Sequence, residues 1–140
     1  MTISDIVKRA HGNAVNHGFW DPAPEFGTAI ALIHSELSEA LEEARAGRPN
    51  LYFPCNAGGV CVDDRPEEGV TCGSRSRKAS DPETYCSARS KKPEGVAVEL
   101  ADAVIRIADL CGHMGIDLEA AIAMKMDYNE TRPFKHGKKF

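Results

Sequence analysis

The sequence has no long hydrophobic run. No stretch approaches the roughly 18 consecutive apolar residues that a membrane-spanning helix needs. The N-terminal segment, Met1 to Ala10, interleaves charged and apolar residues, unlike the uninterrupted apolar core of a signal peptide. We therefore expect a cytoplasmic protein with no membrane partner, in which the five cysteines stay reduced.

The sequence also lacks an excess of positive charge. The chain has 17 lysines and arginines against 21 aspartates and glutamates, which gives a formal net charge of −4. Proteins that bind a nucleic-acid backbone usually carry a strongly basic face, so we expect no nucleic-acid polymer as a partner. A single nucleotide remains a suitable ligand, because a bound divalent metal can reverse the local charge. The length of 140 residues predicts one domain over residues 1–140.

Two metal-binding motifs are missing. The chain has no CxxC pair, so zinc held by loop cysteines is a weaker expectation than free thiols or adventitious disulfides. No histidine lies three residues after a glutamate, which argues against a carboxylate-bridged di-iron bundle. Cys111 falls on an apolar segment and is expected to be a packed core thiol. The four loop cysteines are Cys55, Cys61, Cys72 and Cys86.

Apolar spacing and helix-capping residues predict four helices. Thr2 and Asp5 have the spacing of a capping box, and Asp117 is placed to cap the last helix. Residues 48–92 are rich in Gly, Pro, Ser, Arg and Asp, and we interpret them as a long loop inserted within the domain. The predicted helices run from Thr2 to about Gly18, from about Glu25 to Ala46, from about Pro93 to Cys111, and from about Leu118 to Asn129.

The expected fold is all-α, a bundle-type domain of four helices with a long irregular loop between the second and third. The third helix carries apolar residues around nearly its whole circumference, which is typical of a central, buried helix. One short chain offers little to cover such a helix on every side. We therefore expect oligomerisation to complete the fold, as a homodimer or a homotetramer.

Acidic residues recur on the second and third predicted helices at helical spacing. Glu36, Glu39 and Glu43 share one side of the second helix, and Glu99 and Asp102 lie one turn apart on the third. Carboxylates on a buried helix are costly unless they are paired or bound to metal. If the two helices lie side by side, the acids can share a hard divalent cation. The alternative is an ordinary solvated helix face with surface ion pairs, such as Asp102 with Arg106.

At this point the chain resembles the MazG-like all-alpha nucleoside triphosphate pyrophosphohydrolases, a superfamily that includes dimeric dUTPases, dCTP pyrophosphatases and phosphoribosyl-ATP pyrophosphohydrolase. Two segments look like the ExxE and ExxD metal-binding motifs of the family, and the tail is similar to that of small phage and bacterial members. Together with Gly18-Phe19-Trp20, the resemblance covers everything except the loop. The segments are ALIHSELSEALEEARAG (Ala31 to Gly47), PEGVAVELADAVIRIADL (Pro93 to Leu110) and KMDYNETRPFKHGKKF (Lys125 to Phe140).

The resemblance implies a reaction and a site. The reaction is the hydrolysis of a (deoxy)nucleoside triphosphate to its monophosphate and pyrophosphate, with Mg²⁺ or Mn²⁺ as cofactor. Glu39 is also the candidate to orient or deprotonate the attacking water. Trp20 is weighed between stacking on the base and plugging an edge of the core. The implied metal ligands are Glu36, Glu39, Glu99 and Asp102, and the implied substrate contacts are Lys125 and Asn129, with Arg132 assisting.

Two departures and two alternatives accompany this reading. Some members have an extra glutamate directly before the first ExxE glutamate, where this chain has Ser35, so the number of metal ions is left open. The segment between the motifs is also much longer here than is usual in the family. The alternatives are a phosphoribosyl-ATP pyrophosphohydrolase-like enzyme and a catalytically silent helical dimer that binds nucleotides or another protein.

Overall fold

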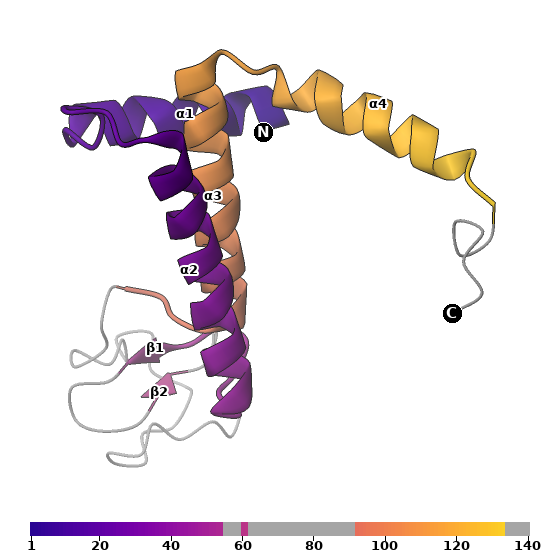
Figure 1. Cartoon of the computed structure of the whole chain (residues 1–140). Coiled ribbons are helices and arrows are strands. Elements are labelled where there is room, and N and C mark those ends of the chain that lie inside the picture. The colour runs from indigo at the N-terminus through magenta and orange to yellow at the C-terminus, as the bar shows by residue number, and fades with distance from the viewer. Residues whose placement is uncertain (55–59, 62–91, 134–140) are drawn as a thin grey trace. The chain divides into compact units, whose positions relative to one another are not determined.

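The computed structural model describes residues 1–54, 60–61 and 92–133. Most of this part of the chain is helical, so the prediction of an all-helical protein is confirmed at that coarse level (Figure 1). A short antiparallel pair of strands, β1 (Phe53–Pro54) and β2 (Val60–Cys61), is an addition that the sequence reading did not anticipate. The helices are α1 (Ile3–Asn16), α2 (Phe26–Arg45), α3 (Val96–Met114) and α4 (Leu118–Glu130).

The chain divides into two compact units. The first unit comprises Met1–Ile30 and Val104–Phe140, and the second comprises Ala31–Ala103. Helices α1 and α4 therefore belong to the first unit, and the β1–β2 pair belongs to the second. Helices α2 and α3 each contribute residues to both units. Among the described residues, none of the helices has both the length and the apolar character that a membrane span requires.

The predicted helix starts of α1 and α4 are confirmed, because their capping interactions are local. The Thr2 hydroxyl accepts a hydrogen bond from the Asp5 N–H at 3.1 Å, and the Asp5 carboxylate accepts one from the Thr2 N–H at 2.8 Å. At α4, the Asp117 carboxylate accepts a hydrogen bond from the Ala120 N–H at 3.0 Å. Each cap satisfies backbone donors that have no partner inside their own helix.

Helix α3 departs from its predicted bounds at both ends. It begins at Val96 instead of about Pro93, because the backbone N–H and C=O of Glu94 pair with those of Tyr52, each at 2.9 Å. It continues through Gly112 to Met114 and ends before Gly115, which has a φ of +65°. Packing explains why a glycine occupies position 112 inside the helix, because a Cβ there would lie only 2.5 Å from the Cβ of His11 on α1.

The core of each unit is built mainly from small side chains. Ala14, Ala108 and Cys111 are buried in the first unit, and Ala40, Tyr52 and Ala103 are buried in the second. The expectation that α3 is buried on nearly all sides is not met within one chain. Leu100 is 47% exposed and Val104 is 50% exposed. A helix this apolar leaves a large hydrophobic surface in contact with water unless something else covers it.

Helices α1 and α4 are joined by a hydrogen bond from the Ser4 N–H to the Glu119 carboxylate at 2.9 Å. The side-chain and backbone hydrogen bonds of Ser4 lower the pKa of Glu119 below its ordinary value of 4.5. A lowered folded-state pKa gives stability that is present above pH 4.5 and is lost as the pH falls through the folded-state value. We expect Glu119→Gln to reduce the loss of stability on acidification, as measured by urea unfolding between neutral pH and pH 3.

Glu130→Gln is the matched control, because it neutralises an exposed carboxylate on the same helix. It should keep the acid dependence of the wild type. If the Glu119 and Glu130 variants showed the same pH profile, the Ser4–Glu119 hydrogen bond would contribute nothing to the stability of the fold.

Candidate metal centre

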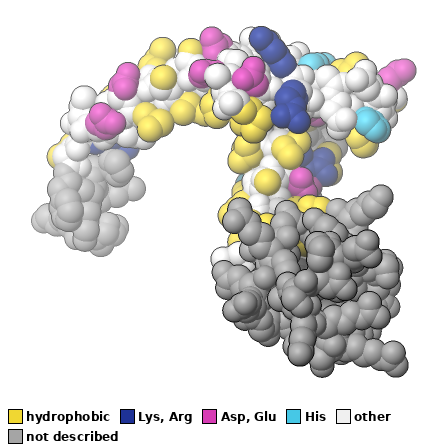
Figure 2. Space-filling view, turned by 180° about the vertical axis from the view of Figure 1, so that it is seen from behind, with side chains coloured by type: hydrophobic (Ala, Val, Ile, Leu, Met, Phe, Trp, Pro, Cys, Tyr) yellow, Lys and Arg dark blue, Asp and Glu magenta, His cyan; other side chains and the backbone are white. Residues whose placement is uncertain are grey.

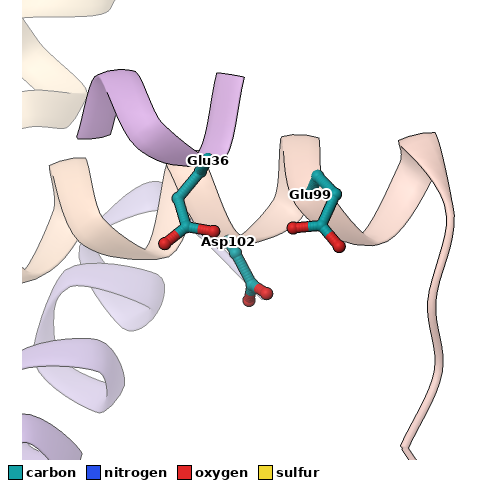
Figure 3. A group of neighbouring side chains, drawn as sticks. All are labelled: Glu36, Glu99 and Asp102. Atoms are coloured by element: carbon teal, nitrogen blue, oxygen red, sulfur yellow. The ribbon is translucent and has the colours of Figure 1, made fainter. Parts of the chain in front are cut away.

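Three carboxylates converge between α2 and α3 (Figure 3). Glu36 comes from α2, and Glu99 and Asp102 come from α3. One oxygen atom from each lies within 4.8 Å of the other two. Glu36 is only 6% exposed, so its charge is largely removed from water. In the described part of the chain, no other group of three histidine, cysteine or acidic side chains has this geometry.

Helical spacing explains why these side chains meet. Glu99 and Asp102 lie three residues apart and therefore share a face of α3. Glu36 and the buried Ala40 lie four residues apart and share a face of α2. All of them belong to the second unit.

The electrostatics of the cluster favour a bound cation. Burial raises the pKa of Glu99, and the negative charges of Glu39, Asp102 and Glu36 raise it further. A divalent cation would replace this repulsion with attraction. Because all the donors are carboxylate oxygens, the cluster fits Mg²⁺ or Mn²⁺ better than zinc, which prefers nitrogen and sulfur ligands.

The fourth predicted ligand, Glu39, lies near the cluster but outside the group of three. Its side chain is exposed, and of the neighbouring carboxylates it has the largest effect in raising the pKa of Glu99. The hydroxyl of Ser35, the residue directly before Glu36, donates to the carbonyl oxygen of Leu32 at 3.1 Å. This hydrogen bond lies within α2 itself.

No family model, curated protein or solved structure matches this chain. The similarity to MazG-like enzymes therefore remains a prediction from the two acidic motifs and the tail. What is known of the site comes from the arrangement of its own residues.

The predicted phosphate-contacting residues belong to the first unit. Lys125 places its ammonium group 5.0 Å from the ring centre of Tyr128. The guanidinium carbon of Arg132 lies 6.0 Å from the same ring. Both cations therefore flank one exposed aromatic side chain at the end of α4. Asn129 is exposed next to this ring.

Trp20 also belongs to the first unit, where it is held by two partners on α3. Its indole N–H donates to the Asp109 carboxylate at 2.8 Å, and its ring stacks on His113 with centroids 3.8 Å apart. The same Asp109 oxygen lies 2.8 Å from Nδ1 of His11 on α1. The Trp20 side chain thus helps to join α1 to α3, which accords with the reading that it plugs an edge of the core. A role in base stacking stays a prediction.

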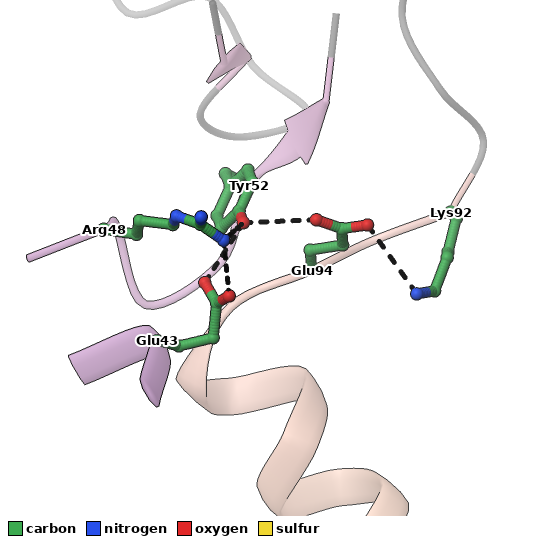
Figure 4. A network of polar contacts seen from close by, with 5 residues as sticks. All are labelled: Glu43, Arg48, Tyr52, Lys92 and Glu94. Atoms are coloured by element: carbon green, nitrogen blue, oxygen red, sulfur yellow. Dashed lines mark hydrogen bonds and ion pairs between the residues drawn. The ribbon is translucent and has the colours of Figure 1, made fainter. Parts of the chain in front are cut away.

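Sequence reasoning missed a polar network near the C-terminal end of α2 and the N-terminal start of α3 (Figure 4). Glu43 follows the helical spacing of Glu36 and Glu39, yet its carboxylate binds Arg48 and the Tyr52 hydroxyl. Tyr52 lies in a segment interpreted as irregular loop, and no local pattern marks it as a partner for Glu43 or Glu94. A contact between residues 42 positions apart leaves no periodic signal in a single sequence.

The cysteine predictions have two outcomes. Cys111 is a buried free thiol on α3, as predicted, and burial raises its pKa. Of the four loop cysteines, Cys61 belongs to β2, and the other three lie outside the described residues. The expectation about zinc on these cysteines is therefore untested, as is most of the predicted loop over residues 48–92.

Proposed function

We propose that this protein is a Mg²⁺-dependent nucleoside triphosphate pyrophosphohydrolase of the MazG-like type. The observation that carries the proposal is the convergence of Glu36, Glu99 and Asp102 from two helices. These residues come from the ExxE and ExxD motifs on which the resemblance rests. A solvated acidic face would leave its carboxylates in water, whereas Glu36 is buried.

In this proposal, Glu36, Glu99 and Asp102 would hold the cation, and a bound cation would supply polarisation of the phosphoryl group and charge to offset that of pyrophosphate. Glu39 is exposed beside them and accepts a proton from the attacking water. The water oxygen forms a bond to the α-phosphorus, and the bond from that phosphorus to the α–β bridging oxygen breaks. The products are the nucleoside monophosphate and pyrophosphate.

The proposal keeps Lys125, Asn129 and Arg132 as the residues that contact the nucleotide. Lys125 and Arg132 carry positive charges suited to phosphate oxygens, and Arg132 can bind them in a bidentate manner. Asn129 offers an amide for a sugar or phosphate oxygen. His113 covers one face of the Trp20 indole, so a nucleobase could stack only on the opposite face.

Assembly into a homodimer or homotetramer is part of the same proposal. Large apolar side chains on the helices of one chain are exposed to water, and these support the proposed assembly. Leu41 on α2, for example, is 49% exposed. Hydrophobic side chains are also visible on the surface of α4, beside acidic ones (Figure 2). A monomeric mass by light scattering would contradict this part of the proposal.

The decisive experiment is an assay of pyrophosphate release from a panel of ribo- and deoxyribonucleoside triphosphates and phosphoribosyl-ATP. Each substrate is tested with Mg²⁺ and with a chelator. We expect release that depends on the metal and yields the monophosphate as co-product. Release from phosphoribosyl-ATP alone would favour the alternative of a phosphoribosyl-ATP pyrophosphohydrolase-like enzyme. Nucleotide binding without release from any substrate would instead identify a catalytically silent binding protein.

A further inference from the structure

The phenol of Tyr52 lies between two carboxylates from different parts of the second unit (Figure 4). Its oxygen is 3.1 Å from Glu43 on α2 and 3.2 Å from Glu94, which lies two residues before the start of α3. Arg48 donates to the same oxygen at 3.1 Å and to Glu43 at 2.6 Å. We call these four residues, Glu43, Arg48, Tyr52 and Glu94, the Tyr52 clasp.

Backbone hydrogen bonds also hold the chain around the Tyr52 clasp. Tyr52 and Glu94 exchange two N–H to C=O hydrogen bonds of 2.9 Å. The carbonyl oxygen of Asn50 accepts a hydrogen bond from the Ala97 N–H at 2.8 Å, which satisfies a donor in the first turn of α3. The segment that follows α2 therefore holds the start of α3 in one position.

Along the chain, the clasp lies close to the carboxylate cluster on both sides. Glu43 lies one helical turn after Glu39 on α2, and Glu94 lies five residues before Glu99. Any change in the separation of Glu43 and Glu94 therefore acts on the helices that carry Glu36, Glu99 and Asp102. The two groups of residues belong to the same unit.

We propose that Tyr52 is a positioning residue of the metal centre, whose hydroxyl holds Glu43 and Glu94 together and so sets the spacing between the ligands on α2 and α3. This inference rests on the proposed function only in assuming that Glu36, Glu99 and Asp102 bind a divalent cation. Tyr52 touches neither the cation nor the substrate. It acts through the helices that present the ligands.

The physical reason lies in charge and burial. The hydroxyl has one proton, which the Glu43 and Glu94 carboxylates share, and its oxygen accepts a hydrogen bond from Arg48, so a polar group separates two negative charges. Tyr52 is 3% exposed, which leaves little room for water to take over these contacts. Burial also raises the pKa of Tyr52, which keeps the hydroxyl protonated as a donor at neutral pH. Without it, Glu43 and Glu94 would face each other with no group between them, and only their outer ion pairs, Glu43 with Arg48 and Glu94 with Lys92 at 3.6 Å, would offset the repulsion.

The test is the affinity of the full chain for Mn²⁺, measured by electron paramagnetic resonance, for the wild type and for Tyr52→Phe. We expect the substitution to weaken Mn²⁺ binding about fivefold. This is a little below the range for groups that hydrogen-bond directly to a metal-coordinating side chain. Circular dichroism and thermal unfolding establish that the variant is folded at the assay temperature. Equal affinities in the folded proteins would overturn the inference and leave the proposed function intact. No Mn²⁺ binding by the wild type would contradict the proposed function itself.

Two further variants separate positioning from a general loss of stability. Tyr128→Phe makes the same chemical change at an exposed tyrosine on α4 and should leave the Mn²⁺ affinity unchanged. Adding Glu94→Gln to Tyr52→Phe removes the facing charge and supplies an amide that can donate to Glu43. This double variant should recover most of the affinity. A double variant as weak as Tyr52→Phe alone would overturn the inference that the clasp acts by holding two carboxylates together.

Discussion

Replacing Asp102 with asparagine is expected to reduce Mg²⁺-dependent pyrophosphate release at least about 100-fold, because it removes a carboxylate from the group that we propose binds the cation. The side chains have nearly the same shape, so the helices should remain folded. Glu36→Gln should have the same effect from the other helix. The measurements are the rate of pyrophosphate release and the Mn²⁺ affinity of each variant.

Metal-free stability gives this prediction a second readout. The negative charges of Glu39, Asp102 and Glu36 already oppose ionisation of Glu99, so Asp102→Asn should leave the thermal stability without metal unchanged or slightly higher. Adding Mg²⁺ should stabilise the wild type and not the variant. Glu42→Gln is the control, because Glu42 is exposed on α2 and pairs with Arg45. Near-wild-type release by Asp102→Asn would show that the metal centre has been assigned to the wrong residues.

Gly95→Ala is expected to lower the free energy of unfolding by about 3 kcal/mol or more. Gly95 has a φ of +110°, which residues with a Cβ rarely adopt. An added Cβ would also lie 2.7 Å from the carbonyl oxygens of Pro49 and Asn50. These are backbone atoms, so neither can rotate away as the tip of a side chain can. Urea unfolding of the purified variant measures the loss.

Gly115→Ala separates the two causes of this effect. Gly115 also has a positive φ, +65°, but a Cβ there would meet nothing within 4 Å. Its substitution should therefore cost only the backbone strain, about 1 kcal/mol. The difference between the two variants reports the close approach of Gly95 to the segment after α2. Equal losses would mean that this segment does not pack against the start of α3 as described.

Much of the helical framework could be read from the sequence because its signals are local. The capping box at Thr2 starts α1, and the N-cap at Asp117 starts α4. Each depends on residues within one turn of each other. Glu99 and Asp102 share a face because they are three residues apart on a helix. The errors at the ends of α3 arise instead from contacts between residues that are far apart in the sequence. The helix passes through Gly112 because His11 packs against it, and it starts late because Glu94 pairs with Tyr52.

The sequence by itself determined that the chain forms amphipathic helices and that acidic residues line one side of two of them, since both follow from spacing along the chain. Only the tertiary structure decided how these acids are used. It buries Glu36 beside Glu99 and Asp102, but it assigns Glu43 to Tyr52 and Arg48. The partners of Glu36 are distant in sequence, and those of Glu43 lie beyond the end of its own helix, where helical spacing no longer applies. Which of several equally spaced carboxylates meets a given partner depends on where two helices approach each other, and helical periodicity carries no information about that.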